Sequence, residues 1–188
     1  EASPPPARPA PSPARPAPGP GLGVSVEAGV ELSSNLLRTL SPGASALVEL
    51  RPRPWLGLGL GALVLPAASI ERGPGEIDVS LFAAEARACA ALPEGQPRLG
   101  LCASAYAGAL RGVGSGFTPS LRATGRWVAL AVGPRFEGDL YGPLHWTAHA
   151  AAVVPVLADH FTVEGLETGF EPPALGAIAG GGLSWTIR

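Results

Sequence analysis

The sequence predicts an all-β chain: eight antiparallel strands, joined in up-and-down order and closed into a transmembrane β-barrel. Three observations support this fold class. Apolar residues alternate with small or polar ones along eight segments, which is the period of a strand with one apolar face. No apolar run reaches the roughly eighteen residues of a spanning helix. The connections are alternately short and long, as in barrels with short periplasmic turns and longer extracellular loops.

The first twenty residues differ in composition from the rest of the chain. Nine of them are Pro, interleaved with Ala, Ser, Arg and Gly. Such a segment buries too little apolar surface to offset its ordering entropy, and it favours extended polyproline II geometry. We therefore expect residues 1–20 to be a disordered Pro/Ala-rich linker and residues 21–188 to be a single barrel domain.

The overall composition argues against nucleic acid as a partner. Only 15% of the residues are charged, the net charge is −2, and the basic residues form no run. Because phosphate binding needs clustered cations, this balance favours a membrane-embedded chain over a nucleic-acid-binding one.

The alternation is clearest where Leu56, Leu58, Leu60, Ala62 and Val64 are interleaved with glycines. The eight expected strands are 22–33, 44–51, 55–65, 77–90, 99–110, 126–137, 144–157 and 174–187. The short connections are 52–54, 91–98 and 138–143, and the long ones are 34–43, 66–76, 111–125 and 158–173. Because short turns lie in the periplasm, both termini are expected there and the four long loops outside the cell.

The aromatic residues are predicted to form two girdles at the membrane interfaces, where amphipathic rings are favoured. Those at the short-turn side are Trp55, Phe136, Tyr141, Trp146 and Trp185. Phe117, Trp127, Phe161 and Phe170 are expected toward the long-loop side, and Phe82 and Tyr106 in mid-strand.

If the face with Val26, Leu58 and Leu101 meets lipid, the opposite face carries charges into the lumen. The expected lumen residues are Glu27, Glu31, Glu49, Arg51, Glu85, Arg87, Arg135, Glu137, His145 and His149. An eight-stranded barrel is just wide enough for side chains to fill, so opposite charges should pair into a polar plug instead of a pore. The alternative is a gated proton or ligand path.

The sequence gives little support for a catalytic, metal or cofactor site. No nucleophile elbow accompanies the histidines, and they lack metal-ligand spacing, so neither a catalytic site nor a metal or cofactor is predicted. Gly57, Gly59 and Gly61 resemble a dinucleotide loop only superficially, because no helix is expected to follow. They are interpreted as making room for bulky interior neighbours across the barrel.

Residues 21–188 resemble the small eight-stranded outer-membrane barrels of the OmpA transmembrane type. The resemblance rests on the eight Gly/Ala-rich alternating segments, the stretch Val153–Phe161 and the closing strand GGGLSWTIR. Members usually end in an aromatic residue, whereas this chain ends in Arg188. The resemblance implies a Gram-negative outer membrane, and the Pro/Ala tract resembles a periplasmic tether.

The two cysteines are predicted to form a disulfide. Cys89 and Cys102 are equidistant from the centre of the expected turn 93–96, so they should face each other across an antiparallel pair. The same register places Arg87 opposite Ser104 and Glu85 opposite Tyr106, and an oxidising compartment favours the bond.

These inferences lead to one main functional hypothesis and two alternatives. The main one is a monomeric structural anchor or surface-interaction barrel without an open pore, in contact with outer-membrane lipid and with a cell-surface or periplasmic protein partner. One alternative is a lipid-modifying outer-membrane enzyme, which needs His149 or a loop histidine beside a nucleophile. The other is a soluble secreted barrel that binds a small apolar ligand, which a lumen of Gly, Ala and charges disfavours.

Overall fold

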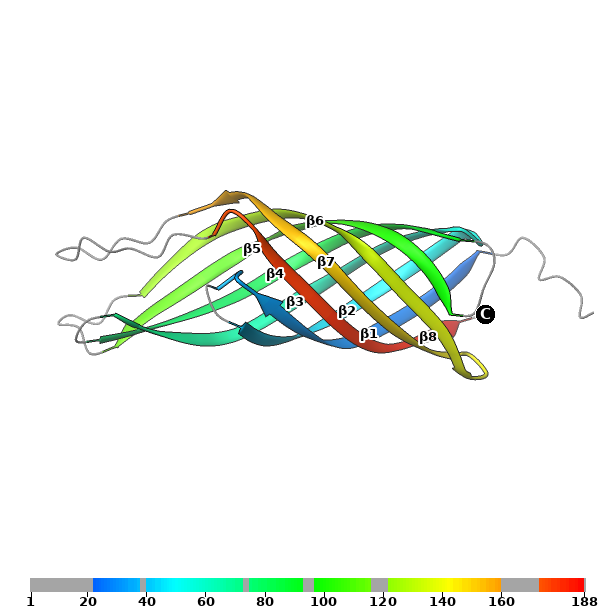
Figure 1. Cartoon of the computed structure of the whole chain (residues 1–188), viewed down its shortest axis with the longest axis horizontal. Helices are drawn as coiled ribbons and strands as arrows, with labels where there is room; N and C mark the ends of the chain where they lie inside the picture. The colour runs from blue at the N-terminus through cyan, green and yellow to red at the C-terminus, as the bar shows by residue number, and fades with distance from the viewer. Residues whose placement is uncertain are drawn as a thin grey trace, which may run out of the picture.

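The computed structural model describes residues 22–37, 40–72, 75–92, 97–115, 122–159 and 173–187. They form eight strands: β1 (Gly23–Ser34), β2 (Leu40–Arg53), β3 (Leu56–Arg72), β4 (Gly75–Ala91), β5 (Arg98–Ser115), β6 (Arg122–Tyr141), β7 (Leu144–Ala158) and β8 (Gly176–Ile187). Each strand pairs antiparallel with the next, and β8 pairs with β1, so the sheet closes into a barrel (Figure 1). No helix among these residues is long and apolar enough to cross a membrane. The expected linker, residues 1–20, lies outside the described residues.

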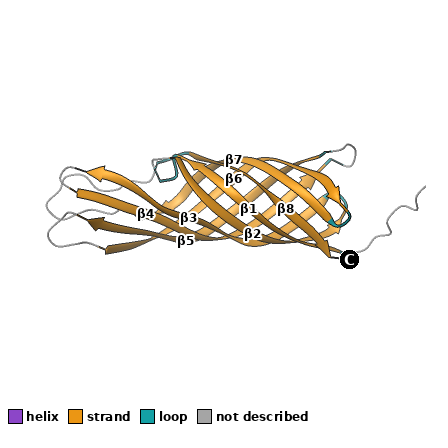
Figure 2. Ribbon diagram, turned by 90° about the horizontal axis from the view of Figure 1, so that it is seen from below, coloured by secondary structure: helices purple, strands orange, loops and turns teal. Residues whose placement is uncertain are grey.

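The barrel has two ends that differ in their connections. The turn end holds Gly23, Ile187 and the connections 54–55, 92–97 and 142–143, and the loop end holds the other four connections. Gly142 has a positive φ of 56°, which a two-residue turn needs and glycine adopts without strain. Figure 2 shows β3, β4 and β5 reaching farthest at the loop end.

The long connections are shorter than the sequence predicts. They span 35–39, 73–74, 116–121 and 159–175, because β2 to β6 continue into segments that the sequence assigns to loops. Pro66 lies at a register shift between Leu65 and Ala68, where the ladder is interrupted and the missing N–H costs little. Pro42 lies where β2 pairs with β1 only, beyond the first pair with β3 at Ala44. The expected contrast in length is therefore reduced.

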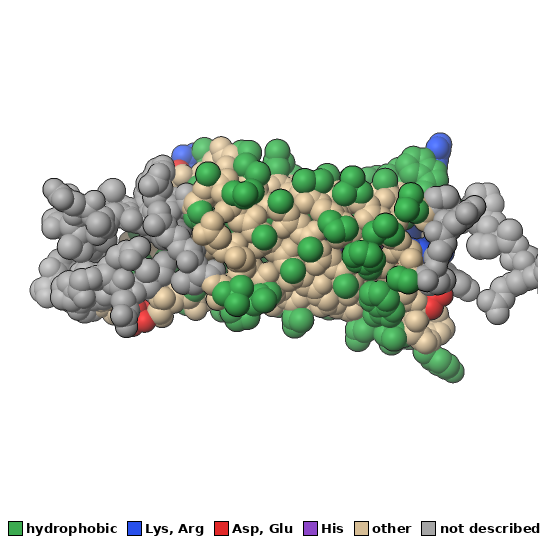
Figure 3. Space-filling view, in the orientation of Figure 1, with side chains coloured by type: hydrophobic (Ala, Val, Ile, Leu, Met, Phe, Trp, Pro, Cys, Tyr) green, Lys and Arg blue, Asp and Glu red, His purple; other side chains and the backbone are tan. Residues whose placement is uncertain are grey.

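The outer wall is apolar. Val26, Leu58 and Leu101 are 44%, 45% and 59% exposed, as the predicted lipid-facing side requires. Figure 3 shows hydrophobic side chains spread along the wall, with the visible charges gathered at the two ends. A continuous apolar surface of this extent is rare on soluble monomers and is typical of lipid-facing barrels.

The turn-end aromatics lie on strand ends or turns, as their sequence positions imply. Trp55, Phe136, Tyr141 and Trp185 are 39–86% exposed, and Trp146 is half-buried. The loop-end expectation is wrong for Trp127, which is 1% exposed and points into the barrel beside Tyr106, with ring centroids 6.0 Å apart. Trp127 shares its alternation with Arg135 and Glu137, so it faces inward with them. Phe117, Phe161 and Phe170 lie outside the described residues.

Candidate functional site in the barrel lumen

Alternate residues of the strands place seven charged side chains in the turn-end half of the lumen. Charges of opposite sign alternate along a series of ion pairs, in the order Glu137, Arg51, Glu49, Arg135, Glu27, Arg87 and Glu85. Arg135 also lies 3.7 Å from Glu137, so the first four residues form a ring. All seven of these residues are among the ten that the sequence predicts for the lumen. We call these seven residues the lumen network.

Arg135 is the centre of the lumen network. Its Nη2 donates to Glu27 Oε2 at 2.5 Å, and its Nη1 donates to Glu49. The Arg135 side chain is 6% exposed, so its charge depends on these carboxylates for the interactions that water would otherwise give. Because β6 reaches β1 and β2 through these bonds, the network connects strands that are not neighbours in the sheet.

Two further arginines extend the network to the mouth and to the wall. Arg51 donates from Nε to Glu49 at 2.6 Å and from Nη1 to Glu137 at 2.8 Å. Arg87 donates from Nε to Glu85 at 2.8 Å. Glu85 also accepts hydrogen bonds from Ser104 at 2.9 Å and from Tyr106 Oη at 3.2 Å.

His149, another predicted lumen residue, forms a separate ion pair. Its Nε2 lies 3.0 Å from Glu31 Oε2, and Glu31 also accepts a hydrogen bond from Ser45 Oγ at 2.5 Å. Glu31 and His149 lie on opposite sides of Gly180, the residue of β8 that pairs with both. A Cβ at position 180 would overlap the Glu31 carboxylate, so the pair depends on a glycine between its members.

The inward glycines of β3 also make room, but for neighbours on the adjacent strand. A Cβ at Gly57 would lie 2.9 Å from a Glu49 carboxylate oxygen, and one at Gly59 would lie 2.9 Å from Leu47. The expectation that they accommodate side chains across the barrel is therefore corrected: both neighbours belong to β2.

The loop-end half of the lumen is filled with apolar side chains, a feature that the sequence reading missed. Trp127, Leu65, Leu81, Leu110 and Val153 are all below 3% exposed and belong to one cluster. Leu36 and Leu37, which follow β1, also belong to it and are 2% and 0% exposed. Asn35 redirects the chain with a φ of 63°, and its Nδ2 donates to the Leu175 carbonyl at 2.8 Å.

Cys89 and Cys102 are bonded to each other, and they are direct partners between β4 and β5. Their Cα atoms are 4.1 Å apart, in the close pairing that antiparallel strands allow. Arg87 faces Ser104 and Glu85 faces Tyr106 in this register, as the sequence predicts.

One His–acid pair has the spacing of two members of a catalytic triad. His145 Nδ1 lies 2.8 Å from Asp139 Oδ1, and His145 pairs in register with Ser184. Among the described residues no hydrogen bond joins Ser184 to His145, and the Asp139 side chain is 66% exposed. This geometry does not favour acyl transfer, which needs a nucleophile bonded to its base and an oxyanion site. Among the described residues, no cluster of three His, Cys, Asp or Glu is placed to hold a metal ion.

Closure, an apolar wall and a filled lumen define an eight-stranded barrel of the outer-membrane type. The crystal structure of Ail, the attachment invasion locus protein of Yersinia pestis, is similar, with a TM-score of 0.59 and 12% identity over 88% of this chain and 99% of that chain. A major outer membrane protein from Thermus thermophilus has a TM-score of 0.57 and 12% identity, over 89% of this chain and 100% of that chain. These likenesses establish the fold. No protein-family model and no curated protein matches the sequence.

Proposed function

We propose that this protein is an outer-membrane barrel that acts as a closed anchor and surface-interaction module, and not as a pore. The observation that carries the proposal is the combination of an apolar outer wall with a lumen that ion pairs cross in one half and apolar side chains pack in the other. The wall is suited to lipid tails, and the filled lumen leaves the outer surface and the two ends for interactions.

The proposal places the turn end and the linker in the periplasm and the loop end outside the cell. Strands β3 to β6 are the longest, and their loop ends form the part that the barrel offers to a partner at the cell surface. The similar Ail is named for attachment and invasion, which agrees with a surface role for this kind of barrel. The barrel is proposed to be a monomer that contacts outer-membrane lipid.

Electrophoresis of protein extracted from outer membranes tests the membrane part of the proposal. Closed membrane barrels resist unfolding in SDS without heat, so boiled and unboiled samples are expected to migrate differently. Leu58→Arg places a charge on the lipid-facing wall and should cost about 2–4 kcal/mol of folding free energy, whereas Ser115→Arg at the exposed end of β5 should cost little. Equal tolerance of both changes, or no mobility shift in several detergents, contradicts a membrane barrel.

Labelling of intact cells with a membrane-impermeant maleimide tests the orientation. A cysteine in place of Ser115 at the loop end should react at once. A cysteine in place of Tyr141, which is 86% exposed at the turn end, should react only after the outer membrane is permeabilised. The reverse order of reactivity contradicts the proposed orientation.

A further inference from the structure

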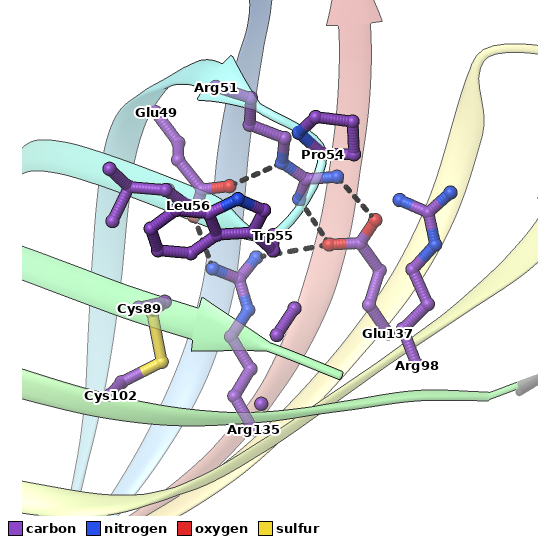
Figure 4. Close-up of a pocket in the computed structure, with 13 residues that line it drawn as sticks. Glu49, Arg51, Pro54, Trp55, Leu56, Cys89, Arg98, Cys102, Arg135 and Glu137 are labelled. Atoms are coloured by element: carbon purple, nitrogen blue, oxygen red, sulfur yellow. Dashed lines mark hydrogen bonds and ion pairs between the residues drawn. A yellow bond between two sulfur atoms is a disulfide. The ribbon is translucent and has the colours of Figure 1, made fainter. Parts of the chain in front are cut away.

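The turn-end mouth of the barrel contains a small pocket that the lumen network does not fill. Its volume is about 40 Å³. On one side it is lined by Arg51, Arg98 and Glu137, and on the other by Trp55, Leu56 and the disulfide (Figure 4). By the usual requirement of at least about 10–15 Å³ for one water, this volume suits a group of about three heavy atoms.

Arg98 lines this pocket, and the lumen network does not pair its charge. It pairs in register with Glu137, so a cross-strand ion pair would be expected between them. Both oxygens of Glu137 are instead bonded to Arg51, which reaches across the lumen from β2. Arg98 is exposed, and within the described residues it has no hydrogen-bond or ion-pair partner. The pairing of Arg51 with Glu137 therefore leaves the donors of Arg98 unused.

The charge balance makes the pocket attractive to anions. Its lining contains three arginines (Arg51, Arg98, Arg135) and two glutamates (Glu49, Glu137), which gives a net charge of +1. Both glutamates already accept hydrogen bonds from arginines of the network. Arg53 lies just outside, with its guanidinium 5.7 Å from the centre of the Trp55 ring, and adds further positive charge to the mouth.

We propose that this pocket binds a small carboxylate and that Arg98 is the main residue that holds it. A planar carboxylate can accept two parallel hydrogen bonds from a guanidinium fork, and such pairs are among the stronger hydrogen bonds in proteins. The short apolar part of the ligand would then pack against Trp55 and Leu56, because a pocket with one cationic and one apolar wall favours an amphiphilic acid. The carboxylate belongs either to a free organic acid or to the end of a peptide.

Binding is measured on the folded full chain in detergent micelles, so the result does not depend on the proposed membrane location or surface role. Sodium propionate is titrated at constant ionic strength, with sodium chloride making up the balance. The readouts are the NMR signal of the Arg98 guanidinium and the fluorescence of Trp55, which is assigned with Trp55→Phe. A saturable change in both signals is expected.

Variants decide the role of Arg98. Arg98→Gln should weaken propionate binding at least tenfold, and Arg98→Lys, which keeps the charge but loses the fork, should have an intermediate effect. Arg111→Gln, an exposed arginine at the loop end of β5, is the matched control and should bind as the parent protein does. Far-UV circular dichroism verifies that each variant keeps the β-structure of the parent protein. Unchanged binding by Arg98→Gln, or an equal response to sodium chloride or to phosphate, overturns the proposal.

Two peptides distinguish the sources of the carboxylate. A short peptide with a free C-terminus and the same peptide with an amidated C-terminus are compared with propionate. If the peptide with the free C-terminus displaces propionate and the amidated peptide does not, the site is assigned to a chain end. If propionate binds and neither peptide displaces it, the site is assigned to a free acid. Failure of propionate and of both peptides to bind contradicts a carboxylate site.

Discussion

The two halves of the lumen are built from the same alternating strands but are filled by different chemistry. The turn-end half holds buried ion pairs, and the loop-end half holds apolar side chains packed around Trp127. In the polar half, charged hydrogen bonds reach from β6 to β1 and β2, and the geometry of each bond restricts how the walls can be placed. In the apolar half, close packing supplies the stabilisation and excludes water. The barrel is therefore closed by ion pairing at one end and by packing at the other.

The largest effect is expected in the apolar half. Trp127→Ala removes the largest fully buried side chain of the described residues and leaves a cavity, so it should lower the free energy of unfolding by about 3–5 kcal/mol. Urea unfolding in lipid vesicles measures the loss. Phe82→Ala, an aromatic residue 60% exposed on the outer wall, is the control and should lose less. Equal losses at both positions would indicate that the loop-end half is not tightly packed.

The polar half should be nearly as sensitive, for a different reason. Arg135→Leu leaves Glu27 with Arg87 alone and Glu49 with Arg51 alone, so the network would hold four glutamates against two arginines. Such an imbalance of buried charge should cost about 3 kcal/mol or more. The same unfolding experiment measures it, with the exposed Arg111→Leu as control. A triple variant that replaces Glu27 and Glu49 as well as Arg135 by apolar residues should recover part of the loss. No recovery would mean that packing of Arg135, and not its charge, is what matters.

Much of this architecture can be predicted from the sequence, because strand alternation determines which side chains face inward. The eight strands, the inward charges and the opposed cysteines all follow from a period of two and one register. Trp127 could also have been placed by the same alternation, since it shares the parity of Arg135. Its position near a strand end instead suggested a membrane-interface residue.

Other features depend on tertiary contacts that no local sequence pattern reveals. The extension of β2 to β6 depends on pairing with a neighbour beyond the segment where alternation is clear. Leu36 and Leu37 lie in a segment without periodicity, and only closure of the barrel shows that they fill its mouth. The Glu31–His149 pair spans two strand spacings, which becomes possible because β8 has a glycine between them.

The disulfide should make a smaller contribution than either half of the lumen. Replacement of both Cys89 and Cys102 by Ala should cost up to about 3 kcal/mol, because the bond restricts a short loop of the unfolded chain. Thiol labelling of the parent protein under denaturing, non-reducing conditions is expected to detect no free thiol when the protein comes from an oxidising compartment. Two reactive thiols would contradict the bond.

The smallest loss of stability is expected at Gly180 of β8, which is compared with its neighbour Gly181. Gly180→Ala pushes a methyl group into the Glu31 carboxylate and should cost about 1–3 kcal/mol by overpacking. Gly181→Ala is the matched control, because its Cβ would meet only the Thr147 carbonyl, at 3.3 Å. Unfolding free energies of the two variants are compared. Equal values would mean that the Glu31–His149 pair does not pass over position 180.

Planar-bilayer conductance tests the central claim that the lumen is closed, by ion pairs in one half and by apolar packing in the other. The folded parent protein is reconstituted into lipid vesicles, and its incorporation is verified by flotation with the lipid. The vesicles are fused with the bilayer, and currents are recorded at neutral pH and moderate salt. The packing of Leu37, Leu65 and Trp127 in the loop-end half predicts a flat current without channel steps. Regular, reproducible conductance steps from the parent protein would contradict a closed barrel.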